Sequence, residues 1–288
     1  MKSKITNIIL VVILLAGFSL MLYPAVSEYV NSKHQSRAIQ SYEEAVSSGM
    51  SEDTIDRFFA DAEDYNQRLS QTEGAFYHPD TVRGYSETLN VTGTGIMGYI
   101  TIDKINVELP LYHSVDVNVL QIAVGHLPGT SLPVGGAGTH SVLSGHRGLP
   151  SSKLFTDLDK LETGDLFYIT ILNKVFTYQV DQVKTVLPVD VDDLQPARGK
   201  DYCTLMTCTP YGINSHRLLV RGVRVDSEEE KATLYIANEG YQIDPIIVAP
   251  VIAAPVILLL VAMVMIQSTL VKRRLLAERK RLRNKRQE

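Results

Sequence analysis

Two long apolar segments near the ends constrain this chain more than any other feature, because each can span a lipid bilayer. Residues 5–23 and 246–271 carry no charged side chain, and a helix needs roughly 20 apolar residues to cross a membrane. Lysines precede the first segment, and Lys272-Arg273-Arg274 directly follow the second. Positive flanks stay on the cytoplasmic side. Both termini are therefore expected in the cytoplasm, and residues 24–244 outside.

The first segment has a second interpretation, as a cleaved signal peptide. Ala25-Val26-Ser27 has the small-x-small pattern that precedes a cleavage site. The apolar stretch is longer than the 7–15 residues usual in a signal peptide, which favours a retained anchor. Pro250 and Pro255 in the second segment are tolerable in a membrane helix.

The formal net charge of −4 conceals a strong asymmetry. The tail 272–288 holds nine Lys or Arg residues and two acidic ones. Without that tail and without Lys2 and Lys4, the chain keeps 17 basic and 30 acidic residues, a net charge of −13. A basic tail can indicate nucleic-acid binding. Here it directly follows an apolar run, so no nucleic-acid partner is predicted.

The two cysteines are not predicted to form a disulfide with each other. Cys203 and Cys208 lie in one predicted strand, roughly 16 Å apart and on opposite faces. A disulfide usually needs Cα atoms closer than about 7 Å. We interpret Cys203 as a small buried apolar residue and Cys208 as a free thiol with a chemical purpose.

The stretch 203–225 is predicted to form a strand, a turn and a second strand. Thr and apolar residues fill the first run, which stops at Pro210, and Leu218-Leu219-Val220 opens the return strand. Pairing of the two strands would bring Cys208 and Arg217 to about 5 Å at the backbone. About sixty residues upstream, His146 lies in a glycine-flanked loop. A thiol, an imidazole and a guanidinium together indicate thiol acyl transfer.

The remaining pattern predicts helices followed by a β-structure. Apolar residues recur at three- and four-residue steps over 28–70, where Ser51-Glu52-Asp53-Thr54 is a helix start signal. Residues 71–90 are expected to be a loop, and 117–123 a short helical piece. Further strands are expected at 99–102, 107–112, 140–144, 166–172, 174–180 and 185–187, and loops at 125–130 and 134–138. Many short strands with Gly and Pro turns are typical of a barrel or sandwich.

The other histidines and the glycines indicate no further site. His126 and His140 are interpreted as structural, and His216 is expected to point away from its neighbour Arg217. No His, Cys, Asp or Glu cluster has metal-site spacing. No Gly-Lys-Ser/Thr follows Gly135, Gly136 and Gly138, so no phosphate loop is predicted. We expect no metal and no cofactor.

At this point the residues resemble a known family, the sortases. Thr204-Leu205-Met206-Thr207-Cys208 and Arg217 look like the sortase signature, Ser144–Pro150 resembles its histidine loop, and Gly125–Pro133 the stretch before it. The resemblance covers about residues 95–225. It implies a closed eight-stranded β-barrel and cysteine transpeptidation at Gram-positive cell surfaces. The second membrane segment with its basic tail is similar to class C, the pilin-polymerising branch.

The resemblance implies Cys208 as nucleophile, His146 as acid and base, and Arg217 as the group that stabilises the oxyanion or the substrate. The same roles follow from the residues, because a thiol needs cationic neighbours to ionise near neutral pH. A leaving amine also needs a proton donor, and a guanidinium presents several donors to developing negative charge. Thr207 is a candidate substrate contact.

Class C sortases commonly carry a lid anchored in the site by Asp-Pro-aromatic, and this chain departs from that pattern. Its Asp-Pro pair is Asp244-Pro245, next to the second apolar segment, and the lid position Phe76–Asp80 lacks that order. Either the lid uses another anchor, for which Tyr77, His78 and Pro79 are candidates, or the cleft is open and this stretch is an ordinary loop.

The predicted fold is mainly β, a sortase-type barrel with N-terminal helices and two transmembrane helices. The expected segments are an anchor (1–23), a helical and lid-like region (24–90), the catalytic barrel (91–228), a linker (229–245), a second transmembrane helix (246–271) and a basic cytoplasmic tail (272–288).

The implied function is membrane-anchored transpeptidation on the outer surface. An LPxTG-like sorting signal would be cleaved between Thr and Gly through a thioacyl intermediate and joined to a pilin lysine amine. Its partners would be pilins or other surface proteins with such signals. The alternatives are transfer to a peptidoglycan-precursor amine, and a non-catalytic surface module in which Cys208 is merely buried.

Overall fold

The computed structural model describes residues 2–225 and scattered residues between 255 and 284, with residues 2–8 by their backbone alone. It divides into two compact units, Met1–Val26 with Asn238–Glu288, and Ser27–Ala237. The second unit contains every strand discussed below. The expected second membrane helix over 246–271 falls largely outside the described residues, so it stays a prediction.

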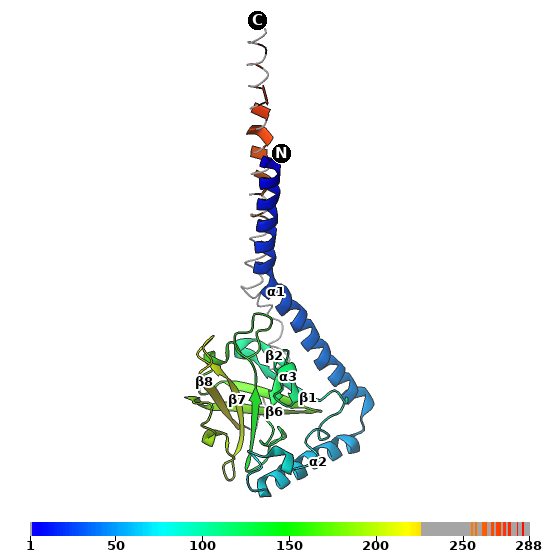
Figure 1. Cartoon of the computed structure of the whole chain (residues 1–288). Coiled ribbons are helices and arrows are strands. Elements are labelled where there is room, and N and C mark those ends of the chain that lie inside the picture. The colour runs from blue at the N-terminus through cyan, green and yellow to red at the C-terminus, as the bar shows by residue number, and fades with distance from the viewer. Residues whose placement is uncertain are drawn as a thin grey trace. The chain divides into compact units, whose positions relative to one another are not determined.

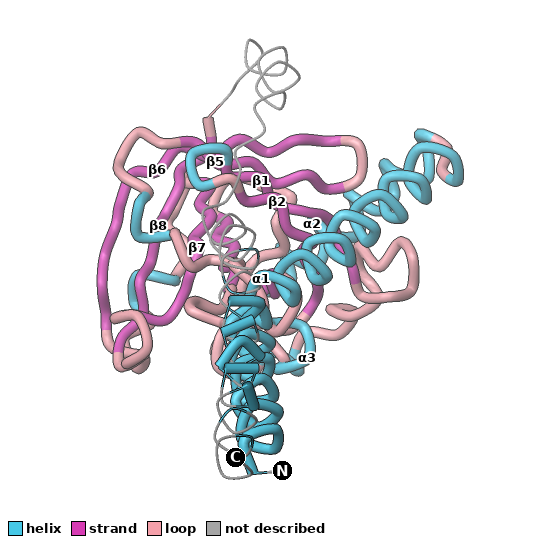
Figure 2. Tube along the Cα trace, turned by 90° about the horizontal axis from the view of Figure 1, so that it is seen from above, coloured by secondary structure: helices cyan, strands magenta, loops and turns pink. Residues whose placement is uncertain are grey.

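Eight strands close into a β-barrel within the second unit, as predicted (Figures 1 and 2). The strands are β1 (Ile96–Ile102), β2 (Val107–His113), β3 (Val124–His126), β4 (Thr139–Ser144), β5 (Leu166–Ile171), β6 (Lys174–Val186), β7 (Asp201–Thr209) and β8 (His216–Arg224). Around the barrel they follow the order β1-β2-β3-β4-β7-β8-β6-β5. The pairs β2–β3 and β4–β7 are parallel, and the others are antiparallel.

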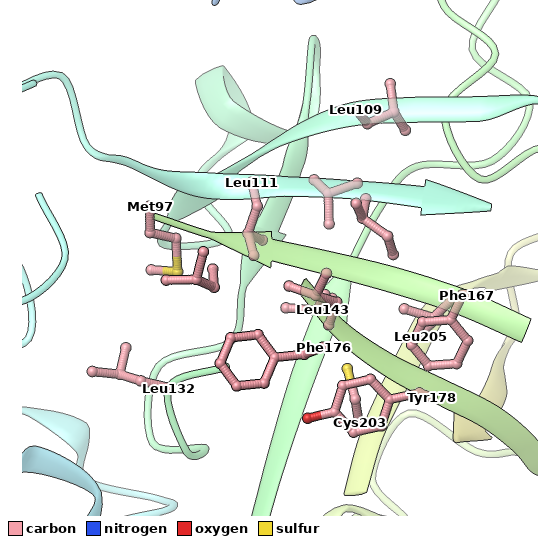
Figure 3. Packing of buried hydrophobic residues seen from close by; sticks show 14 of the residues in the cluster. Met97, Leu109, Leu111, Leu132, Leu143, Phe167, Phe176, Tyr178, Cys203 and Leu205 are labelled. Carbon is pink, nitrogen blue, oxygen red and sulfur yellow. The ribbon is translucent and has the colours of Figure 1, made fainter. Parts of the chain in front are cut away.

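Alternation along the strands separates a barrel interior from an outer face. Cys203, Leu205 and Val220 belong to the interior cluster, where Figure 3 shows Cys203 and Leu205 among aromatic and aliphatic side chains. Their neighbours Met206 and Leu219 belong to a second, smaller cluster on the outer face. Successive side chains of a strand point to opposite faces, so this outer cluster lies on the side to which Cys208 also belongs.

Two long helices lead into the barrel, and the predicted helical region 28–70 is confirmed. They are α1 (Lys2–Gly49) and α2 (Glu52–Gln71), with Ser51 as the N-cap of α2. The Ser51 side chain accepts a hydrogen bond from the Thr54 amide, which satisfies one of the free N–H groups at a helix start. In both views α2 lies outside the strands (Figures 1 and 2). Its buried face, which includes Phe59, packs into the interior cluster.

The Tyr42 hydroxyl fixes α1 to the barrel. It donates to the carbonyl of Met97 in β1 at 2.8 Å and accepts from the amide of Leu172, just after β5, at 2.7 Å. Burial raises the pKa of Tyr42 to about 12, so the hydroxyl keeps its proton and both hydrogen bonds. Residues Ile9–Gly49 of α1 are long and apolar enough for a membrane anchor.

Four short helical pieces and one short α-helix fill the connections. They are η1 (Pro79–Thr81), η2 (Asp103–Ile105), α3 (Val117–Leu120), η3 (Leu158–Lys160) and η4 (Asp192–Leu194). The expected helical piece at 117–123 is confirmed as α3.

Two local predictions were wrong. Gly125 and His126 were expected in a loop, but they form the short strand β3, which pairs with β2 on one side and β4 on the other. A run of three residues that contains a glycine is too short to show an alternating pattern. It forms a strand because β2 and β4 both pair with it. Residues 174–180 and 185–187 were expected as separate strands, whereas β6 runs to Val186 with a register shift at Val180/Gln182.

His126 is fully buried and uses both ring nitrogens. The Tyr85 hydroxyl lies 2.9 Å from Nδ1, and Nε2 lies 2.8 Å from the carbonyl oxygen of Ser131. A carbonyl can only accept, so Nε2 carries the proton and Nδ1 accepts from Tyr85. Burial lowers the pKa of His126 to about 4. The ring is therefore neutral in the folded protein.

Acidification from pH 6.5 to pH 4 should destabilise the barrel, because the unfolded chain binds a proton at His126 that the folded chain does not. A pKa of about 4 against the ordinary 6.5 corresponds to stability on the order of 3 kcal/mol. That stability is present above pH 6.5 and lost as pH falls to 4. Thermal melting of the detergent-solubilised chain across this range measures the loss.

The matched variants are His126→Gln, which keeps a donor and an acceptor, and His34→Gln at an exposed position of α1. The first should flatten the dependence of the melting temperature on pH, and the second should leave it unchanged. An unaltered dependence in His126→Gln would show that another group is responsible.

Candidate functional site

Cys208 lies one residue before the end of β7, where the strand reaches the mouth of the barrel. The strand forms because Thr and apolar residues fill positions 203–209, and Pro210 cannot continue the ladder. Cys208 is a free, half-buried thiol. Cys203, five residues earlier, points into the barrel interior and is fully buried. Opposite faces of one strand thus hold the two sulfur atoms, as predicted.

Arg217 lies directly across from Cys208 in the antiparallel pair β7–β8, as predicted. Figure 1 shows these two strands side by side. The Arg217 Nη1 donates to the carbonyl of Asn214 at 3.4 Å and to that of His216 at 3.1 Å. These bonds hold the guanidinium at the turn between the strands. Among the described residues it forms no ion pair with a carboxylate, so its charge is available to a bound molecule.

His146 follows β4, which runs parallel to β7. Ser144 pairs with Met206, and the amide of Gly145 donates to the Met206 carbonyl at 3.1 Å. β4 ends at Ser144, and two further residues in the same register would bring His146 to the level of Cys208 on the outer face. The ring is half-buried, and desolvation lowers the pKa of His146. Its imidazole is therefore predominantly neutral at neutral pH and can accept a proton.

The loop around His146 is held on several sides. The Thr207 hydroxyl donates to the Gly145 carbonyl at 2.7 Å, and the Phe155 amide donates to the His146 carbonyl at 3.1 Å. At Gly145 the Phe155 ring lies so close that an added Cβ would come within 2.7 Å of it. This contact explains why glycine precedes the histidine.

Arg147 is a further link that the sequence did not reveal. Its Nη2 forms an ion pair with Asp159, and its Nη1 donates to the Thr209 hydroxyl at 3.3 Å. Thr209 is the residue after Cys208, so Arg147 connects the histidine loop to the cysteine strand. A basic residue beside a loop histidine resembles an ordinary surface residue in the sequence, and its partners become visible only in the fold.

A cleft of about 260 Å³ lies on the outer face, and it is lined by Arg217 but not by Cys208 or His146. Its lining includes Leu127, Val186, Leu194, Met206, Leu219 and Arg217. The walls are mainly aliphatic, and the cationic Arg217 lies among them. Such a cleft suits an extended peptide with apolar side chains whose carbonyl groups approach the guanidinium.

Tyr77, His78 and Pro79, the candidate lid residues, do not line this cleft. Tyr77 is 64% exposed, and His78 is exposed as well, while Pro79 begins η1. Their neighbour Phe76 lines the cleft and packs against the outer cluster. The side chain that enters the cleft thus comes one residue before the three candidates.

Thr207 is 2% exposed and points toward the barrel interior. Its hydroxyl is used by the Gly145 carbonyl. This placement supports a structural link to the histidine loop and gives no support for direct contact with substrate. In the part of the chain that the structure describes, no group of three or more His, Cys, Asp or Glu residues could hold a metal ion.

Comparison with known proteins places the barrel in a defined family. The family described as "Sortase domain" matches residues 100–225. Sortase A of Bacillus anthracis is 27% identical over 231 residues, which cover 80% of this chain and 99% of that protein.

Two solved structures are more similar in sequence. Sortase C1 of Streptococcus agalactiae is 50% identical with a TM-score of 0.61, and the match covers 67% of this chain and all of that one. Sortase C of Streptococcus pneumoniae, described in connection with pilin substrate specificity, is 42% identical with a TM-score of 0.60. That match covers 66% of this chain and 97% of the other.

The two thiols should differ sharply in reactivity toward a maleimide. Burial raises the pKa of Cys203 well above its ordinary value, and its sulfur lies in the interior beside Tyr178 (Figure 3). The folded protein should therefore take up one label, at Cys208, and a second only after denaturation. Intact mass measures both stages.

Cys208→Ala should abolish labelling of the folded chain, and Cys203→Ala should retain it. Labelling of Cys203 at a rate comparable to Cys208 under native conditions would contradict the placement of these two side chains.

Proposed function

We propose, from the premise that this chain belongs to the sortase family of cysteine transpeptidases, that it polymerises pilins. It would cleave an LPxTG-like sorting signal between Thr and Gly and join the Thr carbonyl to a lysine amine of another pilin. The observation that carries this proposal is the pairing of Cys208 with Arg217. The parallel register of β4 with β7, which ends two residues before His146, supports the role of His146. The class C structures are also more similar to this chain than the Sortase A of Bacillus anthracis.

In the first half-reaction, the neutral imidazole of His146 takes the proton of the Cys208 thiol as the sulfur attacks the Thr carbonyl carbon. Negative charge develops on the carbonyl oxygen, and Arg217 donates hydrogen bonds to it. Collapse of the tetrahedral adduct breaks the Thr–Gly C–N bond. His146 returns its proton to the leaving glycine amine, and a thioester between Cys208 and Thr remains.

In the second half-reaction an amine attacks and the Cys208 sulfur is the leaving group. A neutral lysine amine attacks the thioester carbonyl, His146 accepts a proton from the attacking nitrogen, and Arg217 again stabilises the oxyanion. Departure of the Cys208 sulfur with the proton from His146 regenerates the thiol and leaves an isopeptide bond. The lowered pKa of His146 fits both halves, since the imidazole must start each one neutral.

We assign the apolar part of α1 as a membrane anchor, with the barrel outside the cell. The length and composition of residues Ile9–Gly49 support the anchor. The acidic charge of the middle and the basic charge of both ends support the orientation. A second span over 246–271 would place both termini in the cytoplasm.

Cys208→Ala should give no thioacyl adduct when the detergent-solubilised chain is incubated with an LPxTG peptide. His146→Ala should slow formation of the adduct by about 10²–10⁴-fold, because the general acid and base are lost. Arg217→Lys should slow it by about 10²-fold, because a point charge replaces the donor fork. Intact mass at short times measures adduct formation.

A lysine peptide and a peptidoglycan-like amine, supplied together, test the acceptor. Preferential transfer to lysine supports pilus assembly, whereas preferential transfer to the other amine would favour cell-wall anchoring. An adduct on Cys208→Ala, or none on the wild type, would count against the proposed chemistry.

We further propose that the loop containing Phe76 is the lid and that its phenyl ring partly fills the cleft. Phe76→Ala should enlarge the cleft, accelerate maleimide labelling of Cys208 and lower KM for the sorting peptide. The control is Val189→Ala, at an exposed position that does not line the cleft, because the Tyr77 ring packs edge-on against the Phe76 ring. Equal effects of both variants would indicate that Phe76 does not restrict access.

A further inference from the structure

Three side chains on one stripe of α1 hold the segment that follows the histidine loop. Glu28 accepts from the Lys153 amide at 2.6 Å, Asn31 Nδ2 donates to the Ser151 carbonyl at 2.7 Å, and Gln35 Nε2 donates to the Ser152 hydroxyl at 3.2 Å. The spacing of three and four residues places all three on one face of the helix. Each bond joins residues more than 110 positions apart in the chain.

The Gln35 contact is shielded from water, whereas those of Glu28 and Asn31 are partly buried. Gln35 is 7% exposed and Ser152 2% exposed, and the Gln35 amide also donates to the Ile122 carbonyl at 2.8 Å. Buried polar groups lose a full desolvation energy when their partner is removed. The position of residues 151–153 therefore depends on α1.

The same segment continues directly into the groups that hold His146. The Phe155 amide donates to the His146 carbonyl at 3.1 Å, and the Gly148 amide donates to the Thr156 hydroxyl at 3.1 Å. Leu149 and Ser152 form an isolated β-bridge. Residues 145–149 and 152–156 are thus two sides of one hydrogen-bonded loop, with His146 on one side and the α1 contacts on the other.

Cys208 has no comparable dependence on α1. It lies in β7, whose ladders with β4 and β8 are built from the barrel's own backbone. The histidine loop is bound both to β7, through Gly145 and Arg147, and to the segment that α1 holds. Loss of the α1 contacts would leave the thiol in its ladder and remove one of the two supports of His146.

We propose that Glu28, Asn31 and Gln35 are positioning residues that set the place of His146 relative to Cys208. The proposal rests on the proposed role of His146 as acid and base. In this proposal α1 both anchors the protein and positions a catalytic side chain.

The test compares full-length chains in detergent. The triple variant Glu28→Ala, Asn31→Ala, Gln35→Ala should slow formation of the thioacyl adduct by at least about tenfold at saturating peptide, because a small displacement of a catalytic group carries a large rate cost. KM should change little. The pH dependence of Cys208 alkylation, which reports the imidazole beside the thiol, should move toward that of His146→Ala.

A matched control separates positioning from stability. Tyr42→Phe removes two buried hydrogen bonds of the same helix, away from the histidine loop. It should lower the melting temperature while keeping the wild-type rate and pH dependence. Glu28→Gln, with Asn31 and Gln35 intact, keeps an acceptor for the Lys153 amide and should retain more of the rate than Glu28→Ala.

The outcomes distinguish the two proposals. If His146→Ala loses the adduct while the folded triple variant keeps wild-type rate and pH dependence, the positioning role is wrong and the catalytic assignment stands. If His146→Ala itself keeps the wild-type rate, the assignment of His146 is wrong, and the positioning proposal falls with it.

Discussion

The parallel pairing of β4 with β7, next to the antiparallel pairing of β7 with β8, is the constraint on which the site depends. It places Cys208 opposite Arg217 and ends β4 two residues before His146, at the same end of the sheet. Because side chains alternate, a shift of one residue in either ladder would turn Cys208 toward the interior or away from its partners. The interior cluster resists such a shift, since the shift would turn the interior side chains of the moved strand, such as Cys203 and Leu205, toward the outer face.

Burial changes the protonation of two histidines in the barrel. The His146 ring loses enough solvent to favour its neutral form, and His126 loses all of it. The two histidines differ in the hydrogen bonds that their ring nitrogens form within the protein. His126 has a full set of fixed partners and supports the cleft wall that contains Leu127. Among the described residues His146 has no side-chain hydrogen bond, which leaves its ring available for proton transfer.

Most strands and the pairing of Cys208 with Arg217 could be predicted because their signals are local, whereas the closed eight-stranded barrel was implied by the family resemblance. Alternating strands, the Pro210 turn and a glycine-flanked histidine are all visible within short stretches of sequence. The features that could not be predicted depend on contacts between residues that are distant in the sequence. β3 exists because β2 and β4 both pair with it. Phe76, rather than Tyr77, enters the cleft because of how an aperiodic loop packs. Arg147 became recognisable only once Asp159 and Thr209 lay beside it.

The attachment of the histidine loop to α1 makes the position of this loop sensitive to force on the helix. The helix that binds residues 151–153 is continuous with the apolar stretch that begins near its N-terminus. A force on that helix would reach residues 151–153 through three hydrogen bonds, whereas it would reach Cys208 through the ladders of the barrel. If His146 and Cys208 have the proposed roles, such a force would change the rate of proton transfer before it displaced the nucleophile.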